Sequence, residues 1–150
     1  MIINRVARLT VFALMLTAST AALAQGPVSQ KLASGTYIVY APSPQVWRVK
    51  LDPNTMTNAS ISGHFNVSEG TPKNIDVFVF NEENYSKWKD DDPAVRNGAK
   101  PLAAASKVAE GEINAKLTDA GYHYLVISDR YQYEGKKTVT ADIKLQYDKK

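Results

Sequence analysis

Short segments in which apolar and polar residues alternate recur along this chain, and turn-forming residues separate them about every eight to twelve positions. In segment 46–51, Trp47, Val49 and Leu51 fall on one face, and segment 139–147 alternates without a break. Successive side chains of a β-strand point to opposite faces, so each segment fits a strand with one buried face. The pattern therefore predicts an all-β protein, built as a sandwich or a barrel.

The expected strands and core can be given by residue number. The strands are 36–41, 46–51, 61–67, 75–80, 106–110, 113–117, 122–128 and 139–147. Segment 75–80 is apolar on both faces and segment 122–128 is strongly apolar, which is typical of central strands covered on both sides. We expect an antiparallel two-sheet β-sandwich. The residues expected to form its shared core are Phe65, Val77, Val79, Leu125, Ile127, Ile143 and Leu145.

Residues 81–104 interrupt the strand pattern. Residues 81–88 fit one or two helical turns, because Asn81 is a favourable N-cap residue and acidic and polar residues follow it. Residues 90–101 then form a polar connection, and a second loop, 131–137, precedes the last strand. We expect both segments to lie outside the sheets.

Residues 1–24 have the three parts of a secretory signal peptide. Arg5 and Arg8 supply a positive start, residues 9–18 are apolar, and a small-residue cleavage pattern precedes Gln25. A membrane anchor is the alternative, but crossing the hydrocarbon core takes about 17 to 25 apolar residues. The apolar run is shorter than that, so we expect cleavage before Gln25 and a periplasmic or secreted product that is not embedded in a membrane.

The mature chain has the size of a single domain. We expect residues 25–34 to form a flexible polar leader and residues 35–150 to form the β-sandwich domain. The sequence contains no cysteine, so disulfides cannot support the core as they do in many small exported domains. The core must therefore suffice without disulfides.

Charge also limits the possible partners. Loss of Arg5 and Arg8 with the signal brings the 18 Lys and Arg residues close to the 15 Asp and Glu residues, and the remaining charges alternate along the chain. Nucleic acid is not an expected partner, because no basic stripe remains to follow a phosphate backbone. The short like-charge runs 90–92 and 136–137 are expected in solvated loops.

Several strand motifs resemble those of GOLD-like β-sandwiches. The run 121–130 (GYHYLVISDR), then 137–139 (KTV) and 143–147 (IKLQY), is similar to the end of that family, and 63–65 (GHF) and 74–79 (NIDVFV) resemble two of its earlier strands. The resemblance implies a jelly-roll-like antiparallel sandwich that serves as a protein- or ligand-interaction module. It implies no catalytic residue.

Nucleophilic catalysis has few candidate residues in this chain. His64 follows Ser62 on the polar face of its expected strand, whereas His123 lies in a very apolar strand that ends at Asp129. Nothing resembles a nucleophile elbow. A surface role for His64 and a hydrogen-bonded, partly buried role for His123 account for both residues, so we assign no catalytic residue.

Metal binding is similarly weakly supported. Asp90, Asp91 and Asp92 could offer oxygens to calcium, but they lack the regular spacing of a calcium loop, and a solvated acidic stretch explains them equally well. Two histidines without cysteine make a poor zinc set. We assign no metal ligand and no cofactor.

Loop aromatics are the remaining candidates for a site. Tyr85 and Trp88 lie in the 81–104 segment, and Tyr131 and Tyr133 lie in the loop before the last strand. Loop aromatics occur at recognition surfaces, but they can also fold back over an open end of the sandwich as a plug. If they form a site, Trp88→Ala should weaken partner binding and leave the melting temperature nearly unchanged.

The sequence thus favours an exported, non-catalytic binding module with an unknown protein or carbohydrate ligand. The alternatives are a hydrolase or calcium-dependent enzyme with a site in residues 81–104, and an accessory domain of a separate catalytic chain. The choice between module and enzyme is left open by the sequence, because a fold does not determine a function.

Overall fold

The computed structural model describes residues 26–130 and 135–150. The expected signal peptide and the two aromatics Tyr131 and Tyr133 lie outside the described residues. The described part of the chain forms eight strands and two short helices. In chain order these are β1 (Val28–Tyr40), β2 (Gln45–Leu51), β3 (Met56–Glu69), β4 (Ile75–Asn81), α1 (Glu82–Trp88), α2 (Pro93–Arg96), β5 (Ala103–Val108), β6 (Glu110–Lys116), β7 (Gly121–Ser128) and β8 (Lys136–Lys149).

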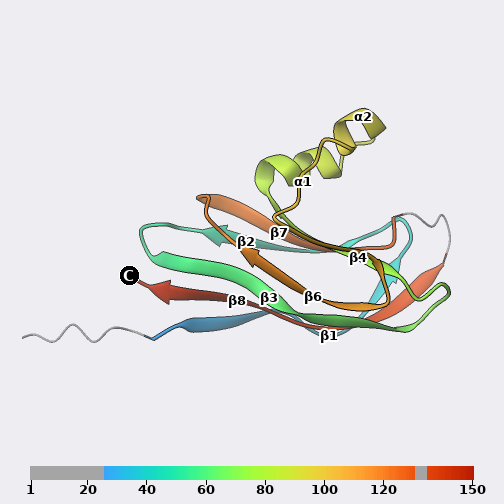
Figure 1. Cartoon of the computed structure of the whole chain (residues 1–150), viewed down its shortest axis with the longest axis horizontal. Coiled ribbons are helices and arrows are strands. Elements are labelled where there is room, and N and C mark those ends of the chain that lie inside the picture. Colours follow the sequence, from blue (N-terminus) through green and yellow to red (C-terminus); the bar gives the residue numbers. More distant parts are fainter. Residues whose placement is uncertain (1–25, 131–134) are drawn as a thin grey trace, which may run out of the picture.

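The strands form two four-stranded sheets that face each other, as Figure 1 shows. Sheet A has the strand order β1-β8-β3-β6, and sheet B has the order β2-β7-β4-β5. All neighbouring strands pair antiparallel. The expected antiparallel two-sheet sandwich is therefore confirmed, and β4 and β7 are the inner strands of sheet B, as their apolar sequences predict.

The main core fills the space between the two sheets. Every residue expected there from the alternation is buried in it, namely Phe65, Val77, Val79, Leu125, Ile127, Ile143 and Leu145. Trp47 and Val49 of β2 pack against this core, whereas Arg48 and Lys50 of the same strand are exposed. The two-residue period of the sequence thus identifies the inward face correctly.

The first strand corrects the expectation of a flexible leader over residues 25–34. β1 begins at Val28, and its residues 28–34 pair with the C-terminal half of β8. Ala33 is fully buried in the main core. This polar segment supplies hydrogen-bond partners for the C-terminal half of β8, and that pairing holds it as an edge strand despite its weak sequence pattern.

The beginning of β8 corrects a second expectation. The loop predicted over residues 131–137 ends earlier than expected, because Lys136 and Lys137 belong to β8. Lys136 is exposed, but Lys137 lies on the same inward face as Val139 and its side chain is 2% exposed. The inward positions of the strand therefore include this lysine, which the sequence analysis assigned to a solvated loop.

The 81–104 segment folds over the outer face of sheet B, where α1 and α2 lie in Figure 1. The expected cap at Asn81 is confirmed, since its side chain accepts a hydrogen bond from the backbone N–H of Asn84. Asp92 caps α2 in the same way through the backbone N–H of Ala94, and Pro93 occupies the first turn. Within the described ranges, neither helix has the length and apolar character needed to traverse a bilayer.

Candidate functional site

A second apolar cluster lies on the outer face of sheet B. Phe78 and Phe80 of β4 point away from the main core and pack with Val126 of β7 and Trp88 of α1. The Trp88 ring centroid lies 5.8 Å from that of Phe80 and 6.2 Å from that of Phe78. This cluster explains why β4 is apolar on both faces: one face serves the sandwich core and the other anchors α1.

Tyr85 and Tyr124 form a second attachment between α1 and sheet B. Their rings stack with centroids 4.0 Å apart and an interplanar angle of 11°. Burial raises the pKa of the Tyr85 hydroxyl, and the neighbouring Tyr124 adds to this effect. The helix is thus fixed to the sheet by aromatic packing along its length.

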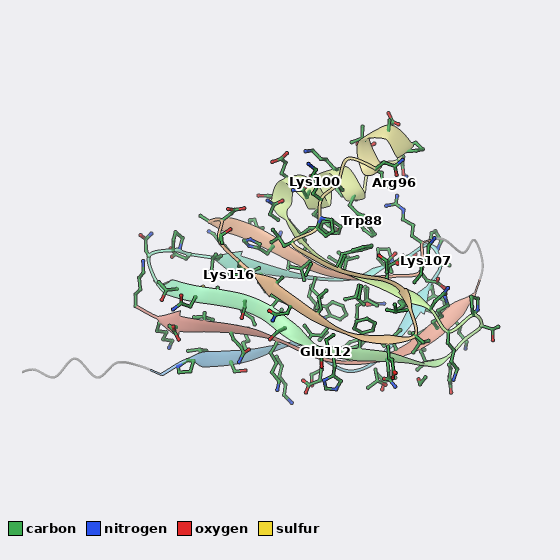
Figure 2. The ribbon with its side chains drawn as sticks, in the orientation of Figure 1. Trp88, Arg96, Lys100, Lys107, Glu112 and Lys116 are labelled. Carbon is green, nitrogen blue, oxygen red and sulfur yellow. The ribbon has the colours of Figure 1, made fainter. Side chains whose placement is uncertain are left out.

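The structure brings together two of the four aromatics proposed from the sequence. Trp88 is only 8% exposed, and it points from α1 toward sheet B in Figure 2. This burial argues against the expectation that Trp88→Ala leaves stability unchanged. Trp88 folds back on the sandwich, as in the alternative, but it packs on the outer face of sheet B and not over an open end. Tyr131 and Tyr133 lie outside the described residues.

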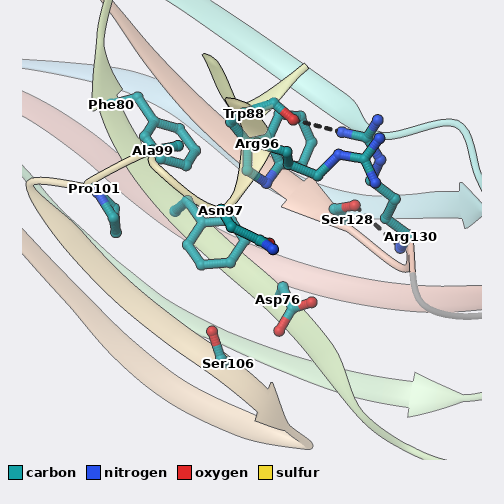
Figure 3. A pocket seen from close by; sticks show the side chains of 11 residues that line it. Asp76, Phe80, Trp88, Arg96, Asn97, Ala99, Pro101, Ser106, Ser128 and Arg130 are labelled. Carbon is teal, nitrogen blue, oxygen red and sulfur yellow. Dashed lines mark hydrogen bonds between the residues drawn. The ribbon is translucent and has the colours of Figure 1, made fainter. Parts of the chain in front are cut away.

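Beside the cluster formed by Trp88, Phe78 and Phe80, a pocket of about 330 Å³ opens between sheet B and the 81–104 segment. Figure 3 shows it from close by. Trp88, Phe78 and Phe80 form its aromatic side, and Ala99 and Pro101 line it from the chain that follows α2. The volume is at the lower end of the range for small-molecule sites.

The opposite end of the pocket is polar. Asp76, Ser106 and Ser128 lie there, from three neighbouring strands of sheet B, and Asp76 and Ser128 are directly paired across β4 and β7. Arg96 and Arg130 also line the pocket, one from the end of α2 and one from the chain after β7. The pocket thus combines an aromatic wall, a carboxylate and two guanidinium groups.

Asp76 is a buried carboxylate with a defined structural partner. Its side chain is 2% exposed, and its Oδ1 accepts a hydrogen bond of 2.8 Å from the backbone N–H of Lys107. Lys107 has a positive φ of 54°, where β5 shifts its register against β4. Burial raises the pKa of Asp76, and the hydrogen bonds from Lys107 and Ser106 partly offset this rise.

Both arginines are held in place by backbone carbonyl groups. Arg96 donates from Nε and Nη2 to the carbonyl oxygens of Asp90 and Asp91, at 2.8 to 3.0 Å. Arg130 donates from Nη1 to the carbonyl oxygen of Trp88 at 2.6 Å, and its guanidinium lies 5.1 Å from the Trp88 ring centroid. Such contacts orient the two guanidinium groups before any ligand arrives.

Sequence reasoning missed the polar part of this pocket. Asp76 does carry a signal, since it is the one charged residue inside the otherwise apolar segment 75–80. Arg96 and Arg130 carry none, because arginines in polar loops are ordinary surface residues. Only the folding of the 81–104 segment over sheet B brings these three residues to one pocket.

The catalytic candidates considered from the sequence do not form a site. His64 is exposed, as expected. His123 is fully buried rather than partly buried, and burial lowers its pKa, with a partial offset from the backbone of Gly121. It lies near the start of β7, whereas Asp129 follows the end of that strand, so about 20 Å separates them at the usual rise per residue.

The acidic run also has a structural explanation. The side chains of Asp90 and Asp92 accept hydrogen bonds from the backbone N–H groups of Asp92 and Ala94. Within residues 26–130 and 135–150, no three His, Cys, Asp or Glu side chains are grouped so as to hold a metal ion. Comparison of the chain with protein-family models and with curated proteins finds no match.

Proposed function

We propose that this chain is an exported, non-catalytic binding module whose site is the pocket beneath α1 and α2. The observation that carries the proposal is the lining of the pocket, in which an aromatic wall faces a carboxylate, hydroxyl groups and two oriented guanidinium groups. In small-ligand sites, apolar and aromatic walls supply contact area and convergent polar groups fix the orientation of the ligand. Rigid sheets and a fixed helix support this one.

The fold proposed with this function is a jelly roll of GOLD-like type. An order of β1-β8-β3-β6 facing β2-β7-β4-β5 supports it, because double-sheet jelly rolls have eight strands arranged as two Greek keys. The motifs that resemble GOLD-like domains fall on β3, β4, β7 and β8. Their family uses such sandwiches as interaction modules, which agrees with a binding role.

The ligand class that fits best is a carbohydrate unit bearing a carboxylate. The apolar face of a sugar ring can pack on aromatic side chains, while its hydroxyl groups bond to groups such as Asp76 and Ser106. Guanidinium groups match the planar geometry of a carboxylate, and Arg96 and Arg130 both line the pocket. A uronic acid offers all three features in one ring.

Titration of the ¹⁵N-labelled protein with glucuronic acid and with glucose tests this proposal. We expect glucuronic acid to shift the amide signals around the pocket and glucose to do so only at higher concentration. Arg96→Gln should weaken the response to glucuronic acid. Lys116→Gln removes the same charge from an exposed site on β6 of the other sheet and should leave the response unchanged.

A second variant separates loss of the ligand site from loss of structure. Ala99 lines the pocket, so Ala99→Leu should fill the space and block binding without removing a charge. The proposal fails if neither sugar shifts any pocket signal. Equal responses to both sugars would show that the arginines do not recognise a carboxylate.

Export is part of the same proposal. It rests on the sequence of residues 1–24, since the positive start, apolar run and cleavage pattern occur in the order of a signal peptide. The N-terminal sequence of protein recovered from the periplasm or the medium tests it. A chain that begins at Gln25 would support export, whereas one that retains residues 1–24 would contradict it.

A further inference from the structure

A buried polar triad joins the two sheets at the start of β8. The Lys137 ammonium lies 2.8 Å from Asp129 Oδ1, 2.7 Å from Asn74 Oδ1 and 2.5 Å from the Asn74 carbonyl oxygen. The side chains of Lys137 and Asp129 are 2% and 5% exposed. Burying an ion pair costs free energy that its mutual attraction does not always repay, so this arrangement calls for an explanation.

The fold places the three residues on different elements. Lys137 occupies an inward position of β8 in sheet A, while Asn74 immediately precedes β4 and Asp129 immediately follows β7, both in sheet B. The lysine side chain passes close to Gly70, in the turn before Asn74. A Cβ added at Gly70 would lie only 2.8 Å from Lys137 Cγ, so this turn confines the lysine side chain. The amino group is therefore held against both partners.

One carboxylate oxygen of Asp129 accepts no hydrogen bond from the described residues. Its Oδ1 accepts from Lys137, but Oδ2 is buried and has no hydrogen-bond partner among the described residues. A buried polar atom without a partner is costly and invites a functional explanation. Oδ2 is therefore an unoccupied acceptor on the same carboxylate that contacts the Lys137 ammonium.

We propose that Lys137 and Asn74 form an intramolecular isopeptide bond, with Asp129 as the catalytic proton carrier. The Lys137 ammonium transfers one proton to Asp129 along their hydrogen bond, which leaves a neutral amine. Rotation of the Asn74 carboxamide presents its carbonyl carbon, and the amine lone pair forms the new C–N bond there. Asp129 can donate its proton to the carbonyl oxygen as the tetrahedral intermediate forms.

The reaction is completed by loss of the Asn74 side-chain nitrogen. Asp129 takes a proton from the attacking nitrogen and passes it to the departing one. As the C–N bond of the carboxamide breaks, the hydroxyl proton of the intermediate also passes through Asp129 to the departing nitrogen, and the carbonyl reforms. The nitrogen leaves as ammonium with the two protons that Lys137 gave up, and the Asp129 carboxylate is regenerated. No oxidant, metal or further reactant is needed for this balance.

The proposed cross-link would give this cysteine-free chain a covalent bond between its sheets. The bond would join residues 63 positions apart and would connect sheet A to sheet B. The sequence has no cysteine, so it lacks the cross-links that many exported domains use. A covalent bond between the sheets would restrict the unfolded chain as a disulfide does.

Tandem mass spectrometry of a tryptic digest of the wild-type protein tests the proposal. We expect a branched peptide that joins the segments containing Asn74 and Lys137, lighter by one ammonia than the two linear peptides together. The assignment is made on the branched peptide, because an N-terminal glutamine also releases ammonia when it cyclises. Linear peptides in which trypsin has cleaved after Lys137 would overturn the proposal.

Matched variants identify the roles of the three residues. Lys137→Arg keeps the charge and Asp129→Asn keeps the shape, and each should leave the two peptides unlinked. Lys136→Arg alters the neighbouring exposed lysine and should leave the cross-link complete. A branch to Asp129 with loss of water would show that the carboxylate, not Asn74, is the acceptor, and would contradict the assignment.

Discussion

The ring of Tyr85 in α1 lies on the ring of Tyr124 in β7, with their centroids 4.0 Å apart. An aromatic pair adds about 0.5 to 1.5 kcal/mol beyond the burial of the ring surfaces. Together with the Asn81 cap and the Trp88 contacts, it makes the 81–104 segment a fixed layer on sheet B. The aromatic wall of the pocket is consequently anchored on the sheet.

Trp88→Ala should lower the free energy of unfolding by about 3 kcal/mol, the low end for truncating a buried aromatic. The variant removes the ring that packs on Phe78 and Phe80. Urea unfolding followed by circular dichroism measures this change. Val95→Ala in α2 is the control, because Val95 is exposed. An unchanged unfolding midpoint for Trp88→Ala would show that α1 does not depend on this contact.

Leu125→Ala should cost about 2 to 5 kcal/mol, because it leaves a cavity in the main core between the sheets. Leu125 is fully buried, whereas Val46 on the neighbouring strand β2 is exposed. Val46→Ala is therefore expected to change stability by less than about 0.5 kcal/mol. A thermal melt of each variant measures the difference, and similar losses for both would mean that the inward face of sheet B is misassigned.

Much of the sandwich could be predicted from the sequence because a half-buried strand leaves a period of two. Segments such as 139–147 show this period clearly. The segment 28–34 does not, since Ser29, Gln30 and Lys31 are all exposed on an edge strand. Its position is set by pairing with β8, which is a long-range property that no local pattern records.

The candidate sites depend even more on long-range contacts. In the sequence, Lys137 belongs to a run of two lysines that is typical of a surface loop. Its burial follows only from the position of β8, which begins at Lys136. Arg96 and Arg130 meet in one pocket because Trp88 anchors α1 on sheet B. The residue types can be taken from the sequence, but the contacts between these residues follow from tertiary packing.

Asp76→Asn should change the pH dependence of stability in a defined direction. Burial raises the pKa of Asp76 above its ordinary value of 3.8, so the folded state holds this proton more tightly than the unfolded state. The stability contribution is full below pH 3.8 and is lost as the pH rises through the raised pKa. The Asp76→Asn variant does not titrate, and it keeps an oxygen that accepts from the Lys107 N–H. As the pH rises from 3.8 through the raised pKa, the wild type loses stability and the variant does not. The stability of the variant relative to wild type should therefore increase with pH over this range.

Asp76→Ala is the matched comparison for that measurement. It removes the same titration but also the acceptor that holds Lys107, so it should be about 1 kcal/mol less stable than Asp76→Asn. Urea unfolding between pH 3 and pH 7, chosen to span the window, gives both quantities. Parallel pH profiles for wild type and Asp76→Asn would contradict the raised pKa.

His123 should make the protein less stable as the solution becomes acidic. The histidine is fully buried on the inward face of β7, and burial lowers its pKa below the ordinary value of 6.5. Below pH 6.5 the unfolded chain therefore binds a proton that the folded chain excludes. Stability from this group is full above pH 6.5 and falls with pH down to the lowered pKa, with a slope of at most about 1.4 kcal/mol per pH unit.

His123→Leu should abolish that part of the slope, because leucine does not titrate and suits the apolar surroundings. The comparison is made on the change of stability between pH 7 and pH 5, so that any loss from imperfect packing cancels. His64→Gln is the control, since it removes the exposed histidine of β3 and should retain the wild-type slope. If His123→Leu and wild type lose stability equally on acidification, another group causes the loss and His123 is not excluded from protonation by the fold.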